Sequence, residues 1–177
     1  MKRSHKRVKR PYGLKHRVVA IVAESIVFMI VVPLFLVVIA SALDQRLQLP
    51  GFTSEPVNLF VGLLFAVPGW FFAMWFVQAQ FKLGEGIPVF ATQKLIAQGP
   101  YAHCRNPMTL GAVLFYIGIS ICMGSLSAVG LTMLFAALSV VYLKMIEEKR
   151  LEEYFGSEYL EYKQRTPFII PRLNRDG

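Results

Sequence analysis

Long apolar runs separated by short polar stretches make up most of the chain. The first run lies between Arg17 and Asp44 and contains one charged residue, Glu24. Its roughly 26 residues, at a rise of ~1.5 Å each, are enough to cross a ~30 Å hydrocarbon layer with some tilt. A second run extends from Val57 to about Phe81. This pattern predicts an all-α protein that crosses a membrane several times.

The third apolar tract, residues 108–142, is too long for a single crossing. It is interrupted by the sequence GSLS at 124–127, in which glycine and serine favour a tight turn. We therefore expect a helical hairpin with arms at 108–123 and 126–145. Together with the first two runs, the hairpin gives four predicted membrane-spanning helices.

Charge is distributed unevenly between the amino terminus and the rest of the chain. All acidic residues follow residue 17, so the net charge of +8 belongs to the first 17 residues. A basic arm beside a membrane helix is explained by the positive-inside rule and by attraction to anionic headgroups, and we expect no nucleic-acid partner. Both termini are predicted to be cytoplasmic. The cations of the arm are Lys2, Arg3, Lys6, Arg7, Lys9, Arg10, Lys15 and Arg17.

The stretch GPYAHCRNPMTLG, residues 99–111, places polar and turn-forming residues between apolar runs. Asn106 followed by Pro107 is typical of a helix start, with Asn at the N-cap and Pro at the first helical position. Free N–H groups beside Arg105 suit a carboxylate or phosphate. An ordinary helix cap beside an arginine that extends to the interface explains the same residues. Neither Cys104 nor His103 has metal-ligand spacing, and we expect no metal centre.

A second polar segment follows the last apolar run and contains adjacent glutamates. Glu147 lies one turn before Leu151, so we expect it on a packed helix face. Glu148 has Lys144 four residues earlier, an arrangement typical of a solvated surface. Adjacent helical residues point about 100° apart, so both carboxylates reach one ligand only if the helix is irregular. The apolar triplet in FIIPRL is expected to anchor the tail against this region.

Two segments together resemble a known family. FKLGEGIPVFATQKLIAQGPYAHCRNPMTLG, and after a further apolar stretch EEKRLEEYFGSEYLEYKQRTPFIIP, are similar to integral-membrane methyltransferases of the isoprenylcysteine carboxyl methyltransferase family, which resemble phospholipid N-methyltransferases. The shared markers are a G-x-G loop, GPY-x-x-x-R-N-P-M, the EE pair, and L-x-x-x-F-G-x-x-Y-x-x-Y with a final proline. The similarity covers roughly residues 60–172.

This resemblance implies that S-adenosylmethionine binds at the cytosolic membrane edge and that a lipophilic acceptor enters between helices. The continuous apolar pattern indicates one membrane domain, 18–177, after the basic arm at 1–17, and the family's motifs fall at 82–172. Arg105 and Glu147 are expected to take part in catalysis. Many members have Tyr where this chain has Thr109, which puts a stacking contact there in doubt. The implied cofactor-binding residues are Gly99, Pro100, Tyr101, Arg105, Asn106, Pro107, Glu147 and Glu148.

Several features remain open at the level of sequence. Gly84 and Gly86 are expected to let the backbone approach the cofactor, although a flexible turn explains them equally well. Glu24 lies either at headgroup level or in the acceptor site. The aromatic cluster at 70–76 either packs, faces lipid or lines the acceptor path. The acceptor itself is not identified: isoprenylcysteine-like carboxylates, lipids, phenols and amines are all compatible.

Two other functions are compatible with parts of the pattern. Membrane sterol reductases, which use NADPH, have a similar G-P-Y…R-x-P hinge and a tail that ends in Y-x-x-Y and proline. The EE pair and the FG dipeptide are not what a reductase is expected to have at these positions. A membrane scaffold that keeps the fold without turnover is the second alternative.

Overall fold

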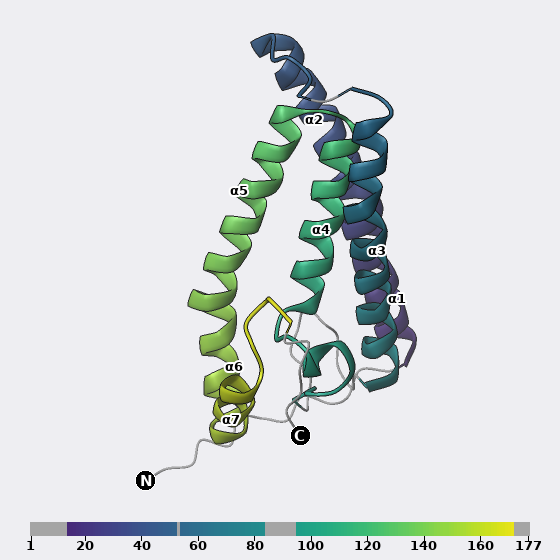
Figure 1. The fold of residues 1–177 in the computed structure, drawn as a ribbon. Helices are drawn as coiled ribbons and strands as arrows, with labels where there is room; N and C mark the ends of the chain where they lie inside the picture. Colours follow the sequence, from purple (N-terminus) through teal and green to yellow (C-terminus); the bar gives the residue numbers. More distant parts are fainter. Residues whose placement is uncertain (1–13, 53, 84–94, 172–177) are drawn as a thin grey trace.

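In the computed structural model, residues 14–52, 54–83 and 95–171 are described. These parts are helical and contain no β-strand. Long helices stand side by side, and a group of short helices gathers at one end of the bundle (Figure 1). The predicted all-α polytopic membrane fold is confirmed. The basic arm lies almost entirely outside the described residues.

The first long helix contains an irregular turn. It consists of α1 (Leu14–Ile26), the π-helical segment η1 (Val27–Val31) and α2 (Val32–Leu47). The π turn directly precedes Pro33, which cannot donate a backbone hydrogen bond to the preceding turn. Gln48 adopts a left-handed conformation with φ 51° and ends the helix. The helix therefore changes its winding once but does not break.

Helices α3 (Val57–Leu83) and α4 (Pro107–Cys122) pack closely along their length (Figure 1). Each presents two glycines seven residues apart, which places them two turns apart on one face. A methyl group at three of them would overlap atoms of the facing helix, and at Gly111 it would make a tight contact, 3.0 Å from the Ala73 amide nitrogen. Small residues are the usual means by which membrane helices approach each other closely. The four glycines are Gly62, Gly69, Gly111 and Gly118.

This packing predicts opposite effects for two glycine substitutions. The added methyl in Gly118→Ala overlaps the backbone of Ala66, so we expect a loss of about 1–3 kcal/mol of stability. Gly130 has no atom within 4 Å of an added methyl, and Gly130→Ala should be neutral or stabilising by up to about 1 kcal/mol. Thermal unfolding in detergent compares the two variants. Equal midpoints would contradict the close approach of α3 and α4.

The predicted hairpin between α4 and α5 (Leu126–Tyr142) is confirmed. Gly124 turns the chain with φ 60°, and the Ser125 hydroxyl accepts a hydrogen bond of 3.0 Å from the Ala128 amide. The Asp44 carboxylate at the end of α2 accepts hydrogen bonds from the Ser125 hydroxyl and the Ser127 amide. The start of α5 is therefore fixed by its own cap and by the first long helix.

Within the residues that the structure describes, three helical stretches are long and apolar enough to cross a membrane: Val18–Leu47, Val57–Ala79 and Leu126–Phe155. Helix α4, which we expected to be a fourth span, is apolar but has 16 residues, or roughly 24 Å at ~1.5 Å per residue. The last stretch continues beyond the predicted end at residue 145. No helix-breaking residue occurs until Gly156, which has φ 60°.

The end of the bundle that we predict to face the cytoplasm is built from short helical elements. Helix α5 continues through a second π segment, η4 (Leu143–Glu147), into α6 (Glu148–Phe155). Helix α7 (Ser157–Arg165) follows, and a 3-10 turn, η3 (Gly99–Ala102), precedes α4. After α7 the chain returns toward the start of α4 as an extended segment, which we call the strap (residues 166–171; Figure 1).

Candidate active site

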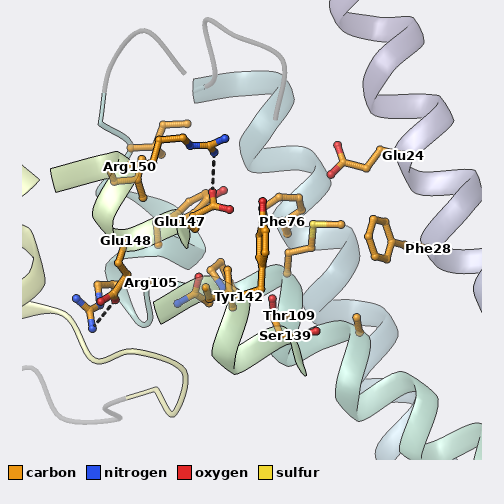
Figure 2. Close-up of a pocket in the computed structure, with 18 of the residues that line it drawn as sticks. Glu24, Phe28, Phe76, Arg105, Thr109, Ser139, Tyr142, Glu147, Glu148 and Arg150 are labelled. Atoms are coloured by element: carbon orange, nitrogen blue, oxygen red, sulfur yellow. Dashed lines mark hydrogen bonds and ion pairs between the residues drawn. The ribbon is translucent and has the colours of Figure 1, made fainter. Parts of the chain in front are cut away.

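A cavity of about 540 Å³ lies between α1, the start of α4, α5 and the short helices. This volume is within the usual range of small-molecule sites. Figure 2 shows acidic and basic side chains on one side of the cavity, with Glu24 and Phe28 on the opposite side. The cavity therefore has one charged end and one largely apolar wall.

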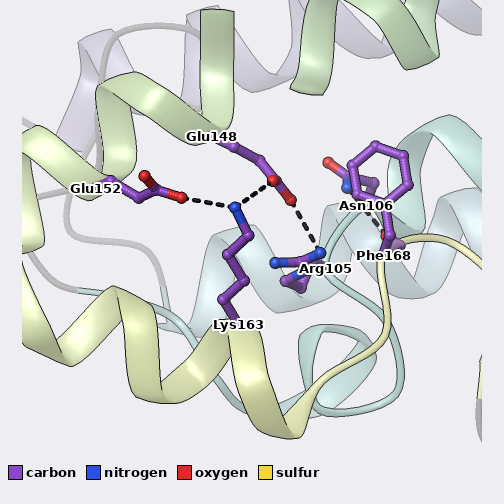
Figure 3. A network of polar contacts seen from close by, with 6 residues as sticks. All are labelled: Arg105, Asn106, Glu148, Glu152, Lys163 and Phe168. Carbon is purple, nitrogen blue, oxygen red and sulfur yellow. Dashed lines mark hydrogen bonds and ion pairs between the residues drawn. The ribbon is translucent and has the colours of Figure 1, made fainter. Parts of the chain in front are cut away.

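The charged end is held by a buried ion network. The Arg105 guanidinium lies 3.0 Å from Glu148, and both side chains are about nine-tenths buried, with 10% and 9% of their surface exposed. The Lys163 ammonium contacts Glu148 at 2.8 Å and Glu152 at 2.6 Å (Figure 3). Both carboxylates raise the pKa of Lys163. Because the four charges alternate in sign, each buried charge has a partner.

Arg105 keeps hydrogen-bond donors that this network does not use. A guanidinium carries five N–H groups, and its Nε and Nη1 atoms are buried without a hydrogen-bond partner among the described residues. Its contact with Glu148 is an ion pair without well-directed hydrogen-bond geometry. Unpaired buried donors are costly, so this side chain is unusually suited to receive an anionic group.

The environments of the two adjacent glutamates are the reverse of those that we expected, a packed face for Glu147 and a solvated face for Glu148. Glu147 is 28% exposed and, among the described residues, pairs only with Arg150, at 3.2 Å, whereas Glu148 is buried. The π segment that ends at Glu147 inserts an extra residue into the turn, so positions assigned from 3.6-residue spacing are shifted. The expected pairing of Lys144 with Glu148 is also wrong, because the Lys144 ammonium lies over the Phe168 ring, 5.1 Å from its centre. Both carboxylates line the same cavity.

The strap holds the start of α4. Asn106 is at the N-cap position as predicted, but its side chain does not cap the helix. Its amide donates instead to the Phe168 carbonyl at 3.0 Å, and the Arg105 backbone N–H donates to the Pro167 carbonyl at 2.9 Å. The Arg105 guanidinium also lies over the Phe168 ring. Phe168 thus contacts the site, as the sequence predicted for the tail, while Ile170 is exposed.

Two tyrosines of α7 form the floor of the charged end. Tyr159 is buried, and burial together with the nearby Glu148 charge raises its pKa to about 12. The Tyr162 hydroxyl donates to the Tyr101 carbonyl at 2.8 Å, and burial also raises its pKa. Both phenols are therefore protonated at neutral pH. Neither these tyrosines nor Lys163 were predicted site residues, although the Y-x-x-Y spacing places the tyrosines on one helix face.

The structure brings most of the implied cofactor-binding residues together. Six of them line the cavity: Tyr101, Arg105, Asn106, Pro107, Glu147 and Glu148. Gly99 and Pro100 do not line it. They form the 3-10 turn, where Gly99 has φ 62° and Pro100 is buried. The Gly84–Gly86 loop lies outside the described residues.

The residues of the apolar wall show where Glu24 and part of the aromatic cluster at 70–76 lie, which the sequence left open. Glu24 and Thr109 both line the cavity, so Glu24 belongs to its wall. Of the aromatic cluster, Phe76 lines the cavity, whereas Trp70 packs against Phe115 with ring centres 5.9 Å apart. Phe71 is 68% exposed, so the cluster divides among cavity lining, helix packing and an exposed apolar surface.

Comparison with known proteins places the chain in a family. The model of the phospholipid methyltransferase family matches residues 57–158. Protein-S-isoprenylcysteine O-methyltransferase B of Arabidopsis thaliana is 31% identical over 85 residues, which are 46% of this chain and 41% of that protein. Cobalt-zinc-cadmium resistance protein CzcN of Cupriavidus metallidurans is 32% identical over 80 residues, which are 45% of this chain and 37% of that protein.

The chain thus matches less than half the length of either curated relative. No solved structure matches it. The resemblance to integral-membrane methyltransferases that the sequence motifs indicated is nevertheless confirmed, since the family match includes the GPY-x-x-x-R-N-P-M motif and the EE pair. The chain belongs to the phospholipid methyltransferase family.

Proposed function

We propose that the protein transfers a methyl group from S-adenosylmethionine to a lipophilic acceptor in this cavity. The observation that carries the proposal is the continuity of the site: one cavity joins the Arg105 and Glu147 end to an apolar wall on the membrane helices. A polar, charged cofactor and a hydrophobic acceptor need these two environments side by side. The family match supports the same reaction class.

The residues at the charged end fit the cofactor. Arg105 has unused donors for a carboxylate, and Glu147 has an exposed carboxylate for an ammonium or for ribose hydroxyls. Tyr101 and Tyr142 line the cavity, and aromatic faces attract a cation such as a sulfonium. Glu148 is already compensated by Arg105 and Lys163, so we assign it the role of orienting Arg105.

When bound, the cofactor supplies an electrophilic methyl group on a positively charged sulfur. The chain's own contribution is alignment and exclusion of water. Phe168 and the strap fix the start of α4, so Arg105 and Asn106 keep their positions relative to α6. A carboxylate acceptor would be ionised already and would need no base, whereas an amine or phenol would have to lose a proton.

We further propose that the site faces the cytoplasm. It lies at the end of the bundle where α1 begins (Figure 1), and the residues that precede α1 in the sequence are rich in Lys and Arg. The positive-inside rule assigns that end to the cytoplasmic side. The cofactor would then enter from the cytoplasm and the acceptor from the lipid.

A methyl-transfer assay tests the proposed function. The full chain, reconstituted in vesicles made from a total lipid extract, is incubated with S-adenosylmethionine that carries a radiolabelled methyl group. We expect label to enter the organic phase with the wild type and to stay at background with Arg105→Ala. If the folded wild type leaves the organic phase unlabelled with extracts from several sources, the proposal is contradicted.

A further inference from the structure

Glu24 is a carboxylate in the wall of the cavity that no shared motif includes. It lies on α1, outside the residues 57–158 that match the family model. It lines the main cavity and a small neighbouring one. Figure 2 shows its carboxylate directed toward the cavity, on the side opposite Glu147. The Glu24 carboxylate is therefore supplied by α1, which the family model does not include.

The Glu24 carboxylate has no hydrogen bond or ion pair among the residues that the structure describes. The neighbouring Ser25 differs, since its hydroxyl donates to the Ile21 carbonyl of the same helix at 2.7 Å. A charged side chain within a membrane helix is costly, and it usually faces a cavity where it serves a function. The position of Glu24 on the cavity wall fits that rule.

The helix that carries Glu24 is fixed against the rest of the site. The Tyr116 hydroxyl of α4 donates to the Phe28 carbonyl at 2.7 Å, one turn beyond Glu24, and Tyr116 is 1% exposed. Phe28 lies in the π segment η1, where such carbonyls are free to accept other donors. Phe76 and Met108 line the cavity beside Glu24. The Glu24 carboxylate is thus carried by a fixed stretch of helix and lies among apolar side chains.

We propose that Glu24 selects the acceptor by accepting a hydrogen bond from its head group, so that the preferred acceptor is a lipophilic amine or hydroxyl compound rather than a carboxylate. This inference rests on the proposed function. A second carboxylate could sit beside Glu24 only if one of the two groups took up a proton, which weakens its binding at neutral pH. An N–H or O–H group satisfies the Glu24 oxygens, and the apolar side chains around it accommodate the lipophilic part.

Calorimetric titration of the full chain in detergent, with S-adenosylhomocysteine present, tests this inference. The probes are decylamine, 1-decanol and decanoic acid, which share one alkyl chain and differ in the head group. For the wild type, the amine or the alcohol should bind at least about tenfold more tightly than the acid. The amine and alcohol titrations identify which donor is preferred.

Two variants connect the preference to the side chain. Glu24→Gln keeps the shape but removes the charge, so the preference over decanoic acid should fall by about tenfold. Ser25→Ala is the matched control on the same helix turn and should keep the preference. Both variants should bind S-adenosylmethionine as the wild type does and stay folded, and Glu24→Gln should unfold at the same temperature or a higher one because it loses a charge that has no partner among the described residues.

Three results would overturn the role of Glu24: equal affinity of the wild type for the acid and the other probes, no binding of any probe, or an unchanged preference in Glu24→Gln. Failure of the wild type to bind S-adenosylmethionine would have a different meaning. It would overturn the proposed function, and the role of Glu24 in that function with it.

Discussion

Arg105→Ala should abolish measurable binding of S-adenosylmethionine and also destabilise the protein. The substitution removes the buried donors at Nε and Nη1, and it leaves the buried Glu148 with Lys163 as its one remaining cation in the described part of the chain. Breaking a buried ion pair from one side typically costs about 3–5 kcal/mol, and we expect the lower end because Lys163 remains. Calorimetry measures the binding, and thermal unfolding in detergent measures the stability.

Arg105→Lys separates the two effects. Lysine keeps the positive charge beside Glu148 but loses the planar arrangement of donors. We therefore expect most of the stability to be retained, while affinity for the cofactor falls by about tenfold or more. If Arg105→Ala stays folded and binds S-adenosylmethionine with wild-type affinity, Arg105 has no part in the cofactor site.

Glu147→Gln should mainly weaken cofactor binding, whereas Glu148→Gln should mainly destabilise the protein. Glu147 is partly exposed and pairs with Arg150 at the surface, so its loss should lower cofactor affinity by about tenfold with little change in stability. Glu148 balances two cations in a buried position, so its loss should cost about 3 kcal/mol of stability. The two variants are isosteric, and each serves as the control for the other.

Calorimetry and thermal unfolding of both variants decide between the two roles. The reverse pattern, with a stable Glu148→Gln that loses the cofactor and an unstable Glu147→Gln, would assign the ligand role to Glu148. Two stable variants with wild-type affinity would remove the glutamate pair from the site.

The helices were predictable because membrane length and helix ends leave strong local signals. The apolar runs marked the long helices, Pro107 marked the start of α4, and Gly124 with Ser125 marked the hairpin. The two π segments were not predictable, since a pattern of 3.6-residue spacing assumes a regular helix. Because of that assumption, the sequence predicted the environment of Glu147 for Glu148 and that of Glu148 for Glu147.

The site was predictable only as far as its motifs extend. The family resemblance indicated Arg105 and the glutamates, but the contacts that hold them join distant parts of the chain. The Asn106 amide, which the sequence assigned to a helix cap, bonds to Phe168, 62 positions away. Lys163 reaches Glu148 only because α7 folds back beside α6. No local pattern records such pairings.

The most direct test of the account is a calorimetric titration of the folded full chain in detergent with S-adenosylmethionine and, separately, with NADPH. The cavity that joins Arg105, Glu147 and the apolar wall predicts binding of S-adenosylmethionine and no binding of NADPH. Binding of NADPH alone would contradict the account in favour of a reductase. Binding of neither to protein with a cooperative unfolding transition would contradict it in favour of a scaffold without turnover.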